Sequence, residues 1–321
     1  MSFSRRQLAA AGLAIGASSL APRSVFARAS PAPQVAPIYR SKVGDIQITA
    51  IADGYLDLDL VQLFPIAKQS PQTTAKLLAA ARTTNPVKTF VNTYVVNTGS
   101  KLILIDTGTG NAMGPSLGAL QKNLAAAGFK PEDIDLVLLT HLHPDHVNGL
   151  PTADGKVAFP NAEVAVSELD YKFWLDEGIA SRAPSDMQGF FKLARDAMKL
   201  YGDRVKRFTA PTEVSPGVQA LPAPGHTIGH TMYRISSGKD QLLIWGDIVH
   251  VQALQFARPG ASLAFDSDQA QAAATRKRVF DMSAKDGVMV AGMHLSFPGL
   301  GYVERGAGGY AYAPAQFAPV V

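Results

Sequence analysis

The chain has 321 residues, of which 47% are hydrophobic and 17% are charged, and its formal net charge is +4. This is the composition of a globular protein with material for one large core or two small ones. The first 29 residues hold four arginines and no acid, so the rest of the chain is formally neutral, which argues against nucleic acid as a partner. The sequence has no cysteine, which excludes disulfides, thiolate metal ligands and a lipoprotein anchor.

Residues 1–29 have the pattern of a twin-arginine export signal. Arg5 and Arg6 precede a mildly apolar stretch over residues 8–20, and the segment ends in Ala-Arg-Ala, the small-x-small pattern of a signal-peptidase site. We expect cleavage before Ser30 and a periplasmic or secreted protein. The alternatives are a disordered terminus or a short membrane anchor. The apolar stretch is shorter than the ~20 residues that span a bilayer, so we expect no stable anchor.

Residues 30–37 form a proline-rich leader, and residues 38–321 are expected to fold as a single domain. β-Branched runs predict a strand at 46–54 and a hairpin of strands at 91–96 and 101–105 around the turn Asn-Thr-Gly-Ser. Helical spacing predicts one helix at 72–81, capped by Ser70, and another that opens at Gly114-Pro115 and runs to residue 127.

The same succession of strands and helices continues along the chain. Strands are expected at 134–140, 162–166, 218–221, 231–235, 241–245 and 288–291, and helices at 168–176, 186–201 and 268–285. Two β-rich halves with helices outside predict a layered α/β architecture, a four-layer αββα sandwich.

Three histidines and an aspartate fall within six residues directly after the apolar run 134–140: His141, His143, Asp145 and His146. Four ionisable groups this close predict a bound cation, because without one they would repel one another. In an extended segment residues i and i+2 point to one side, so His141 and His143 can share one ion. Pro144 breaks any helix and bends the chain, so Asp145 and His146 can face a second ion ~3.5–4 Å away.

Three further candidate ligands, His226, Asp247 and His294, also follow apolar strands and lie close to glycine. Strand ends at one sheet edge converge in space, so we expect these side chains to join the cluster. A single histidine at a strand end is more often a hydrogen-bonded structural residue than a ligand. We interpret His230 and His250 in this way, with metal contact as the alternative.

These motifs resemble those of the metallo-β-lactamase-fold hydrolases. The resemblance rests on HxHxDH (141–146), Gly-His-Thr with His226, Gly-Asp with Asp247, the final His294, and the turn LILIDTG (102–108) that contains Asp106. The stretches YVVNTGSKLILIDTG, THLHPDHVNGL, AFPNAEV and HLSFPGLG are similar to the branch of methyl parathion hydrolases and related lactonases and aryl esterases. The resemblance covers residues 39–314.

The resemblance implies the αββα fold and a role for each of these residues. His141, His143 and His226 would hold one metal, Asp145, His146 and His294 the other, Asp247 would bridge both, and Asp106 would orient a ligand imidazole from behind. The implied cofactors are two divalent ions, most often zinc, although nitrogen and oxygen ligands also permit manganese, cobalt or iron. A homodimer is implied by the resemblance alone.

Such a centre predicts hydrolysis. Two cations that share one water lower its pKa to near neutral and create a hydroxide nucleophile, while one ion polarises the substrate oxygen. Asp247 and Asp145 are the candidate catalytic carboxylates, with Asp247 taking the residual proton. This chemistry fits lactones, aryl esters, thioesters, β-lactams and phosphotriesters alike.

Several of these activities are disfavoured by the sequence. The lack of cysteine argues against one class of β-lactamase, and the presence of Asp247 argues against the class that lacks a cysteine ligand. The formally neutral chain argues against an RNA phosphodiesterase. A glutathione thioesterase would need a basic cluster, and near the C-terminus only Arg-Lys-Arg at 276–278 is a candidate.

The resemblance places apolar residues over the metals, where they would form the walls of a substrate pocket, although each of them could instead be ordinary core. They are Met113, Trp174, Phe190, Phe191, Phe256 and Phe265, with Trp174 as the best candidate. Aromatic walls favour a small, neutral, aromatic substrate. No evident general acid is present, which favours a phenolate-type leaving group. His250 and Phe265 depart from the resemblance and would polarise and narrow the pocket.

We therefore expect a dinuclear metal-dependent hydrolase of lactones or aryl esters with weaker activity on aryl phosphotriesters. The alternative within this class is an organophosphate (methyl parathion-type) phosphotriesterase. The alternative of another class is a periplasmic metal-binding protein without catalysis. An open pocket above the ions argues against that alternative, since purely structural sites close their coordination sphere.

Overall fold

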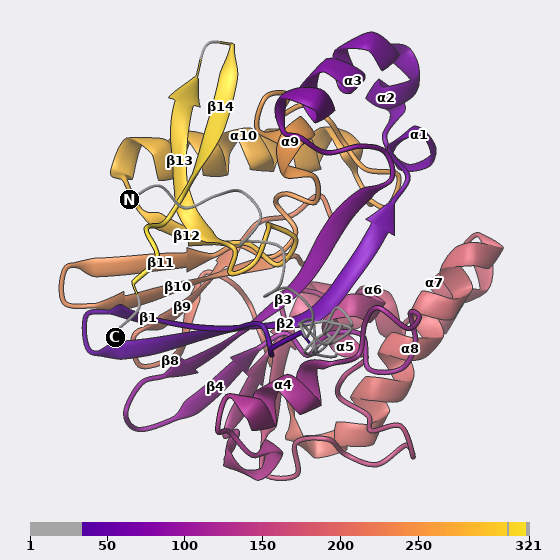
Figure 1. Cartoon of the computed structure of the whole chain (residues 1–321). Coiled ribbons are helices and arrows are strands. Elements are labelled where there is room, and N and C mark those ends of the chain that lie inside the picture. The colour runs from indigo at the N-terminus through magenta and orange to yellow at the C-terminus, as the bar shows by residue number, and fades with distance from the viewer. Residues whose placement is uncertain (1–33, 307, 319–321) are drawn as a thin grey trace, which may run out of the picture. The chain divides into compact units, whose positions relative to one another are not determined.

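The structure is a computed structural model that describes residues 34–306 and 308–318 (Figure 1). The expected export signal at 1–29 and most of the expected leader lie outside the described residues. Within the part that is described, no helix combines the length and the apolar character that a membrane crossing requires. Ala36–Val321 form one compact unit, and this unit contains all the strands and helices of the described residues.

The first sheet contains, among the described residues, seven strands in chain order. They are β1 (Ile38–Val43), β2 (Ile46–Leu58), β3 (Val87–Asn97), β4 (Leu102–Ile105), β5 (Leu136–Leu138), β6 (Glu163–Ser167) and β7 (Val205–Phe208). Strands β1 to β4 pair antiparallel, and β4 to β7 run parallel. Parallel strands end at the same edge of the sheet, and this edge carries part of the site described below.

The second sheet, again counted over the described residues, also holds seven strands in chain order. They are β8 (Thr212–Ser215), β9 (Val218–Pro222), β10 (Thr231–Ser237), β11 (Asp240–Ile244), β12 (Met289–Ala291), β13 (Leu300–Gly306) and β14 (Gly309–Pro314). All neighbours pair antiparallel except β11 and β12, which are parallel. As a result β9, β11 and β12 all end at one edge.

Helices cover the outer faces of both sheets (Figure 1). They are α1 (Leu60–Leu63), α2 (Pro65–Gln69), α3 (Pro71–Ala80), α4 (Leu120–Ala126), α5 (Pro144–Val147), α6 (Glu168–Leu175), α7 (Glu177–Arg182), α8 (Ser185–Tyr201), α9 (Gln252–Gln255) and α10 (Gln269–Asp286), with 3₁₀ turns η1 (Pro131–Asp133) and η2 (Gly202–Arg204). Figure 1 shows α10 beside the second sheet and α4, α6 and α8 beyond the first.

Alternating side chains explain why the strands are apolar on both faces. In β3, Tyr94 and Val96 belong to the core between the two sheets, whereas Val95 between them packs toward the helices. In β5, Leu136 and Leu138 face the second sheet in the same way. A strand buried on both faces reads as a continuous apolar run, as these strands do. The predicted four-layer αββα sandwich is confirmed.

Some expected boundaries were wrong for local reasons. The helix expected from Gly114-Pro115 begins only at Leu120, because Gly114 and Gly118 adopt positive φ angles of 105° and 80°, which an α-helix does not contain. Strand β2 continues past the expected end at residue 54 to Leu58, after a register shift at Gly54. The hairpin β13–β14 and the short helices α1, α2, α7 and α9 were not predicted.

Candidate metal centre

The candidate ligands lie where strands of both sheets end. Strands β4 and β5 lead into Asp106 and into residues 141–146, respectively. Strands β9, β11 and β12 lead into His226, Asp247 and His294. Strands that run in the same direction end at the same edge, so five segments far apart in the sequence meet. The expected convergence of strand ends is observed.

Pro144 does not break a helix, as the sequence suggested, but begins one. It is the first residue of α5, and His143 precedes it at the N-cap position in extended conformation. Proline fits the first turn because the N–H it lacks would have no partner there. The change of direction between His143 and Asp145 therefore comes from the start of a helical turn, which carries Asp145 and His146.

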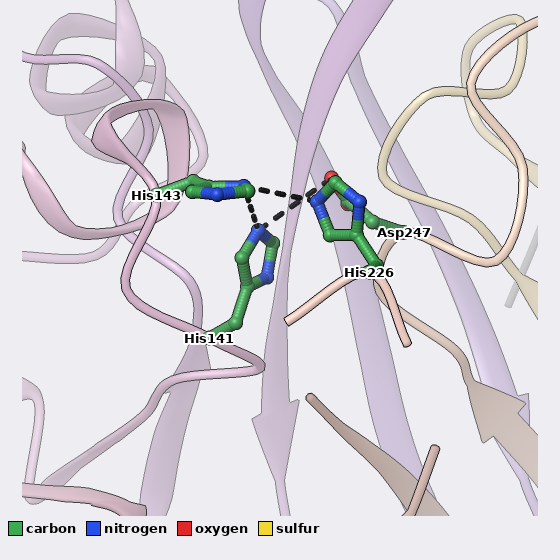
Figure 2. Close-up of side chains that lie close together, drawn as sticks. All are labelled: His141, His143, His226 and Asp247. Carbon is green, nitrogen blue, oxygen red and sulfur yellow. Dashed lines mark hydrogen bonds and ion pairs between the residues drawn. The ribbon is translucent and has the colours of Figure 1, made fainter. Parts of the chain in front are cut away.

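The first group of candidate ligands contains His141, His143, His226 and Asp247 (Figure 2). Nδ1 of His143 lies 3.0 Å from Nε2 of His141 and 2.9 Å from Nε2 of His226. Oδ2 of Asp247 lies 3.1 Å from Nε2 of His226 and 3.6 Å from Nε2 of His141. Figure 2 shows His141 and His143 on one side of the centre and His226 and Asp247 on the other.

The second group contains Asp145, His146 and His294. Oδ2 of Asp145 lies 3.5 Å from Nε2 of His146 and 3.4 Å from Nε2 of His294. Oδ1 of Asp247 lies 3.3 Å from Nε2 of His146, and its Oδ2 lies 3.2 Å from Nε2 of His294. Nδ1 of His294 is held by the Phe90 carbonyl at 2.7 Å. Asp247 thus touches both groups, which is the position of a bridging ligand.

The hydrogen-bond chemistry of the two groups fits cations. Nδ1 of His143 faces two imidazole nitrogens but carries at most one proton, so it can donate to only one of them. Nε2 of His146 and Oδ1 of Asp247 are buried and lie 3.3 Å apart, but no hydrogen bond joins them to each other or to another described residue. Buried polar atoms rarely stay unpaired, and a divalent ion in each group would satisfy these atoms.

The pKa values of the histidines separate into two sets. The pKa is raised for His146, His226 and His294 and lowered for His141, His143, His230 and His250. Burial lowers the pKa of all of them. For His226 the hydrogen bonds and charges of Asp247 and Asp266 outweigh burial and raise the pKa to about 9. The centre without metal therefore holds protons near neutral pH, which an ion must displace.

Two carboxylates hold ligand rings from behind. Oδ2 of Asp106 lies 2.7 Å from Nδ1 of His146, as the resemblance implied. Oδ1 of Asp266 lies 2.8 Å from Nδ1 of His226, a contact that the sequence did not reveal. Each contact leaves Nε2 of the same ring facing the centre. Asp266 was missed because a single acidic residue in a polar loop has no pattern that sets it apart.

A cavity with a largely apolar wall opens onto both groups of ligands. It is lined by His143, Pro144, Asp145, His226, Asp247 and His294, by the expected residues Met113, Phe190, His250 and Phe265, and by Leu56, Leu58, Leu63, Thr89 and Leu263. The ring centroids of Phe190 and Phe265 are 6.1 Å apart. The leucines were not expected. Leu56 and Leu58 lie in the extension of β2, Leu63 lies in α1, and Leu263 lies between α9 and α10.

Trp174 does not line the cavity, although it was the best candidate from the sequence. Its side chain is fully buried on α6, and its ring packs edge-on against His143 with 5.2 Å between ring centroids. Phe191 packs against Trp174 in the same core, and Phe256 packs against α10, so neither reaches the cavity. A helix near the site has several faces, and the sequence alone did not indicate which one Trp174 occupies.

The remaining two histidines differ in their roles. His230 is structural as interpreted, since Nδ1 donates to the Ala223 carbonyl and Nε2 accepts the backbone N–H of Asp247. Nε2 of His250 lies 3.0 Å from Oδ2 of Asp247, and these two residues form a third possible metal-binding group with His294. The alternative of metal contact is therefore geometrically open to His250.

The Arg-Lys-Arg cluster at 276–278 is not a basic surface patch. Arg276 is buried and donates hydrogen bonds to the carbonyls of Ile248, Pro259 and Ala261. Only Lys277 and Arg278 are exposed.

The family model described as "Metallo-beta-lactamase superfamily" matches residues 87–294. The chain belongs to this superfamily. A solved superfamily structure, that of the hydrolase AbOPH, superposes with a TM-score of 0.84 at 36% identity and covers 89% of this chain and 100% of that one. AidC, described as a dizinc quorum-quenching lactonase, superposes with a TM-score of 0.83 at 28% identity and covers 88% of this chain and 99% of that one.

Curated relatives match this chain over shorter stretches. An N-acyl homoserine lactonase of Bacillus cereus is 30% identical over 121 residues, which are 38% of this chain and 40% of that protein. The lactamase-like protein adaB of Aspergillus niger is 52% identical over 60 residues, or 19% and 17% of the two chains. The resemblance to metallo-β-lactamase-fold hydrolases is thereby confirmed. The finer resemblance to methyl parathion hydrolases stays a prediction.

Proposed function

We propose that this protein is a hydrolase that uses two divalent metal ions to cleave lactones or aryl esters. The observation that carries the proposal is Asp247, which contacts both groups of candidate ligands at the floor of an apolar cavity. His141, His143 and His226 would hold one ion, and Asp145, His146 and His294 the other. Bound ions of this kind supply an activated water and polarise the substrate oxygen.

The side chains of the chain itself supply position and proton acceptance. Asp106 and Asp266 fix the rings of His146 and His226 from behind, so that these ligands need little reorganisation. Asp145 and Asp247 are the two carboxylates among the described residues that line the cavity, and we assign Asp247 to accept the proton that the attacking water releases. The leucine and phenylalanine side chains around them exclude bulk water and strengthen these electrostatic contacts.

The cavity wall supports a neutral substrate of modest size. Among the described residues that line it, none is lysine or arginine, so a charged acid or phosphate group would find no cationic side chain. Flat rings at Phe190 and Phe265 suit a planar lactone or aryl group. A phosphotriester carries three substituents around a tetrahedral centre and is therefore wider than a planar ring, so we rank it below lactones and aryl esters.

The ranking of lactone above phosphotriester has two further supports. His250 brings a polar ring into the cavity 3.0 Å from Asp247, where an apolar residue was expected from the resemblance. AidC and the Bacillus cereus protein, to which this chain is similar, are both named as lactonases. Main activity on aryl phosphotriesters remains the second candidate, and the family resemblance supports it.

A non-catalytic metal-binding protein is the candidate of another class. Structural metal sites close their coordination sphere with protein ligands, whereas here the candidate ligands of both groups face a cavity. An open position next to the ions is what a substrate requires. This feature favours the hydrolase.

The test is a panel of dihydrocoumarin, acyl homoserine lactones, 4-nitrophenyl acetate and methyl parathion with zinc-loaded protein, with and without chelator. We expect chelator-sensitive turnover and a higher kcat/KM for dihydrocoumarin than for methyl parathion. The reverse order would establish the phosphotriesterase. Two bound ions without turnover of any compound would favour the binding protein.

Zinc, a homodimer and export by the twin-arginine route complete the proposal. Zinc is favoured by the nitrogen-rich ligands and by the description of AidC as dizinc. Elemental analysis and light scattering of the purified protein test the metal and the dimer. Replacement of Arg5 and Arg6 by lysine should retain the protein in the cytoplasm, and unchanged export would overturn the assigned route.

A further inference from the structure

The helix α6 carries a buried carboxylate that belongs to neither group of candidate ligands. Asp170 is fully buried and does not line the cavity. Its Oδ2 accepts hydrogen bonds from the backbone N–H of Leu142 at 3.1 Å and from the hydroxyl of Thr227 at 3.0 Å. Its Oδ1 accepts the backbone N–H of Gly229 at 2.7 Å.

These donors come from two segments that carry metal ligands. Leu142 stands between His141 and His143, in the segment that follows β5 of the first sheet. Thr227 directly follows His226, in the segment that follows β9 of the second sheet. One carboxylate therefore connects the ligand segments of the two sheets at the place where Nδ1 of His143 and Nε2 of His226 come within 2.9 Å.

The surroundings of Asp170 leave little room for another arrangement. A Cβ atom on Gly229 would lie 2.4 Å from the backbone nitrogen of Asp170, so only glycine permits this approach. One helical turn further on, Trp174 packs edge-on against the ring of His143. The same face of α6 thus contacts the backbone next to the ligands and the ring of one ligand.

We propose that Asp170 is a positioning residue that sets the distance between His143 and His226. It thereby tunes the affinity of the first ligand group for its metal ion. Hydrogen bonds to a carboxylate are stronger than those between neutral groups, and three of them fix both segments in one geometry. Groups behind the ligands of a metal typically change its affinity by about 10–100-fold. The inference rests on the two-ion centre of the proposed function and not on its substrate.

Asp170→Asn is the direct test, because it keeps the size of the side chain and replaces one acceptor oxygen by an NH₂ group. The apoprotein is titrated with Zn²⁺ in competition with a chelator. We expect two binding steps in the wild type, and in the variant one step weakened about tenfold with the other unchanged. With saturating zinc the KM for dihydrocoumarin should stay at the wild-type value.

Asp53→Asn is the matched control. Asp53 is an equally buried carboxylate whose oxygens accept four hydrogen bonds, all from Thr109, Gly118 and Leu120, none of which is next to a candidate metal ligand in the chain. Its replacement should lower thermal stability and leave both zinc affinities unchanged. A loss of zinc affinity in this variant equal to that in Asp170→Asn would overturn the specific role of Asp170.

Thr227→Val provides a milder version if Asp170→Asn does not fold. It removes one hydroxyl donor to Asp170, and Thr93→Val removes a buried hydroxyl that donates to the Ile51 carbonyl elsewhere. Thr227→Val should weaken one zinc step and Thr93→Val neither. Wild-type affinities in folded Thr227→Val and Asp170→Asn would refute the role of Asp170. A wild type that binds a single ion would overturn the two-ion centre on which the inference rests.

Discussion

The carboxylate of Asp106 lies 2.7 Å from Nδ1 of His146, on the side of the ring opposite to Nε2, which faces Asp145 and Asp247. Both partners are buried. The carboxylate therefore accepts a hydrogen bond from Nδ1–H and leaves Nε2 free to bind an ion. The backbone of Asp106 has a φ of 59°, a left-handed conformation that aspartate and asparagine tolerate better than most residues.

Asp106→Asn tests this contact without backbone strain. We expect the zinc affinity of the second group to fall about 10–100-fold, because the ring of His146 loses its charged partner. Chelator competition measures the affinity, and activity at limiting zinc should fall while excess zinc restores most of it. Unchanged affinity would show that the carboxylate is not needed to orient His146.

The division of the ligands into two groups can be tested by removing one member of each. His143→Ala should lose the ion of the first group and Asp145→Ala the ion of the second. Both should lower hydrolysis by more than about 100-fold, since groups behind the ligands alone are worth up to that factor. Metal analysis after dialysis should find one ion in each variant. Two ions retained in either variant would contradict the division.

Metal binding should release protons. The pKa of His226 is about 9 in the centre without metal, against an ordinary value of 6.5, so at pH 7 this ring carries a proton that an ion must displace. Zinc affinity should therefore rise with pH up to about 9. The proton also stabilises the metal-free fold below pH 6.5, and this contribution is lost as the pH rises through 9. Calorimetric titration in two buffers of different ionisation enthalpy measures the release. A binding enthalpy that does not depend on the buffer would contradict it.

Arg276 is expected to stabilise the fold rather than to bind substrate. Its guanidinium donates to three carbonyls around the segment after β11, and Arg276→Met leaves these acceptors unpaired. The free energy of unfolding should fall by about 1–3 kcal/mol. Arg278→Met on the exposed side of α10 is the control and should change it by less than about 0.5 kcal/mol. Urea denaturation of the zinc-loaded proteins compares them. Equal stabilities would show that the buried hydrogen bonds contribute nothing.

The ligands could be found in the sequence because each follows a strand whose apolar pattern is easy to detect. The direction of the strands then brings the ligands together. His141 follows a strand of the first sheet and His294 a strand of the second, yet both strands end at one place. Asp266 and Asp170 could not be found in this way. Each is a single acidic residue whose importance depends on three-dimensional proximity, which neither periodicity nor spacing encodes.

The cavity wall was harder to predict than its floor. Phe190 and Phe265 line the cavity and Trp174 does not, because an aromatic residue on a short helix can face the core or the cavity with the same sequence pattern. Leu58 was overlooked since it lies in the part of β2 beyond Gly54, where the expected strand ended. Substrate selection depends on such residues, whereas the hydrolytic chemistry depends on the ligands at the strand ends.

The crystal structure of the zinc-loaded protein, with anomalous diffraction to locate the metal, tests the two-ion centre most directly. We predict two ions about 3.5–4 Å apart. One should be bound by His141, His143 and His226, the other by Asp145, His146 and His294, with Asp247 in contact with both. A single ion, or two ions that do not share Asp247, would contradict the account.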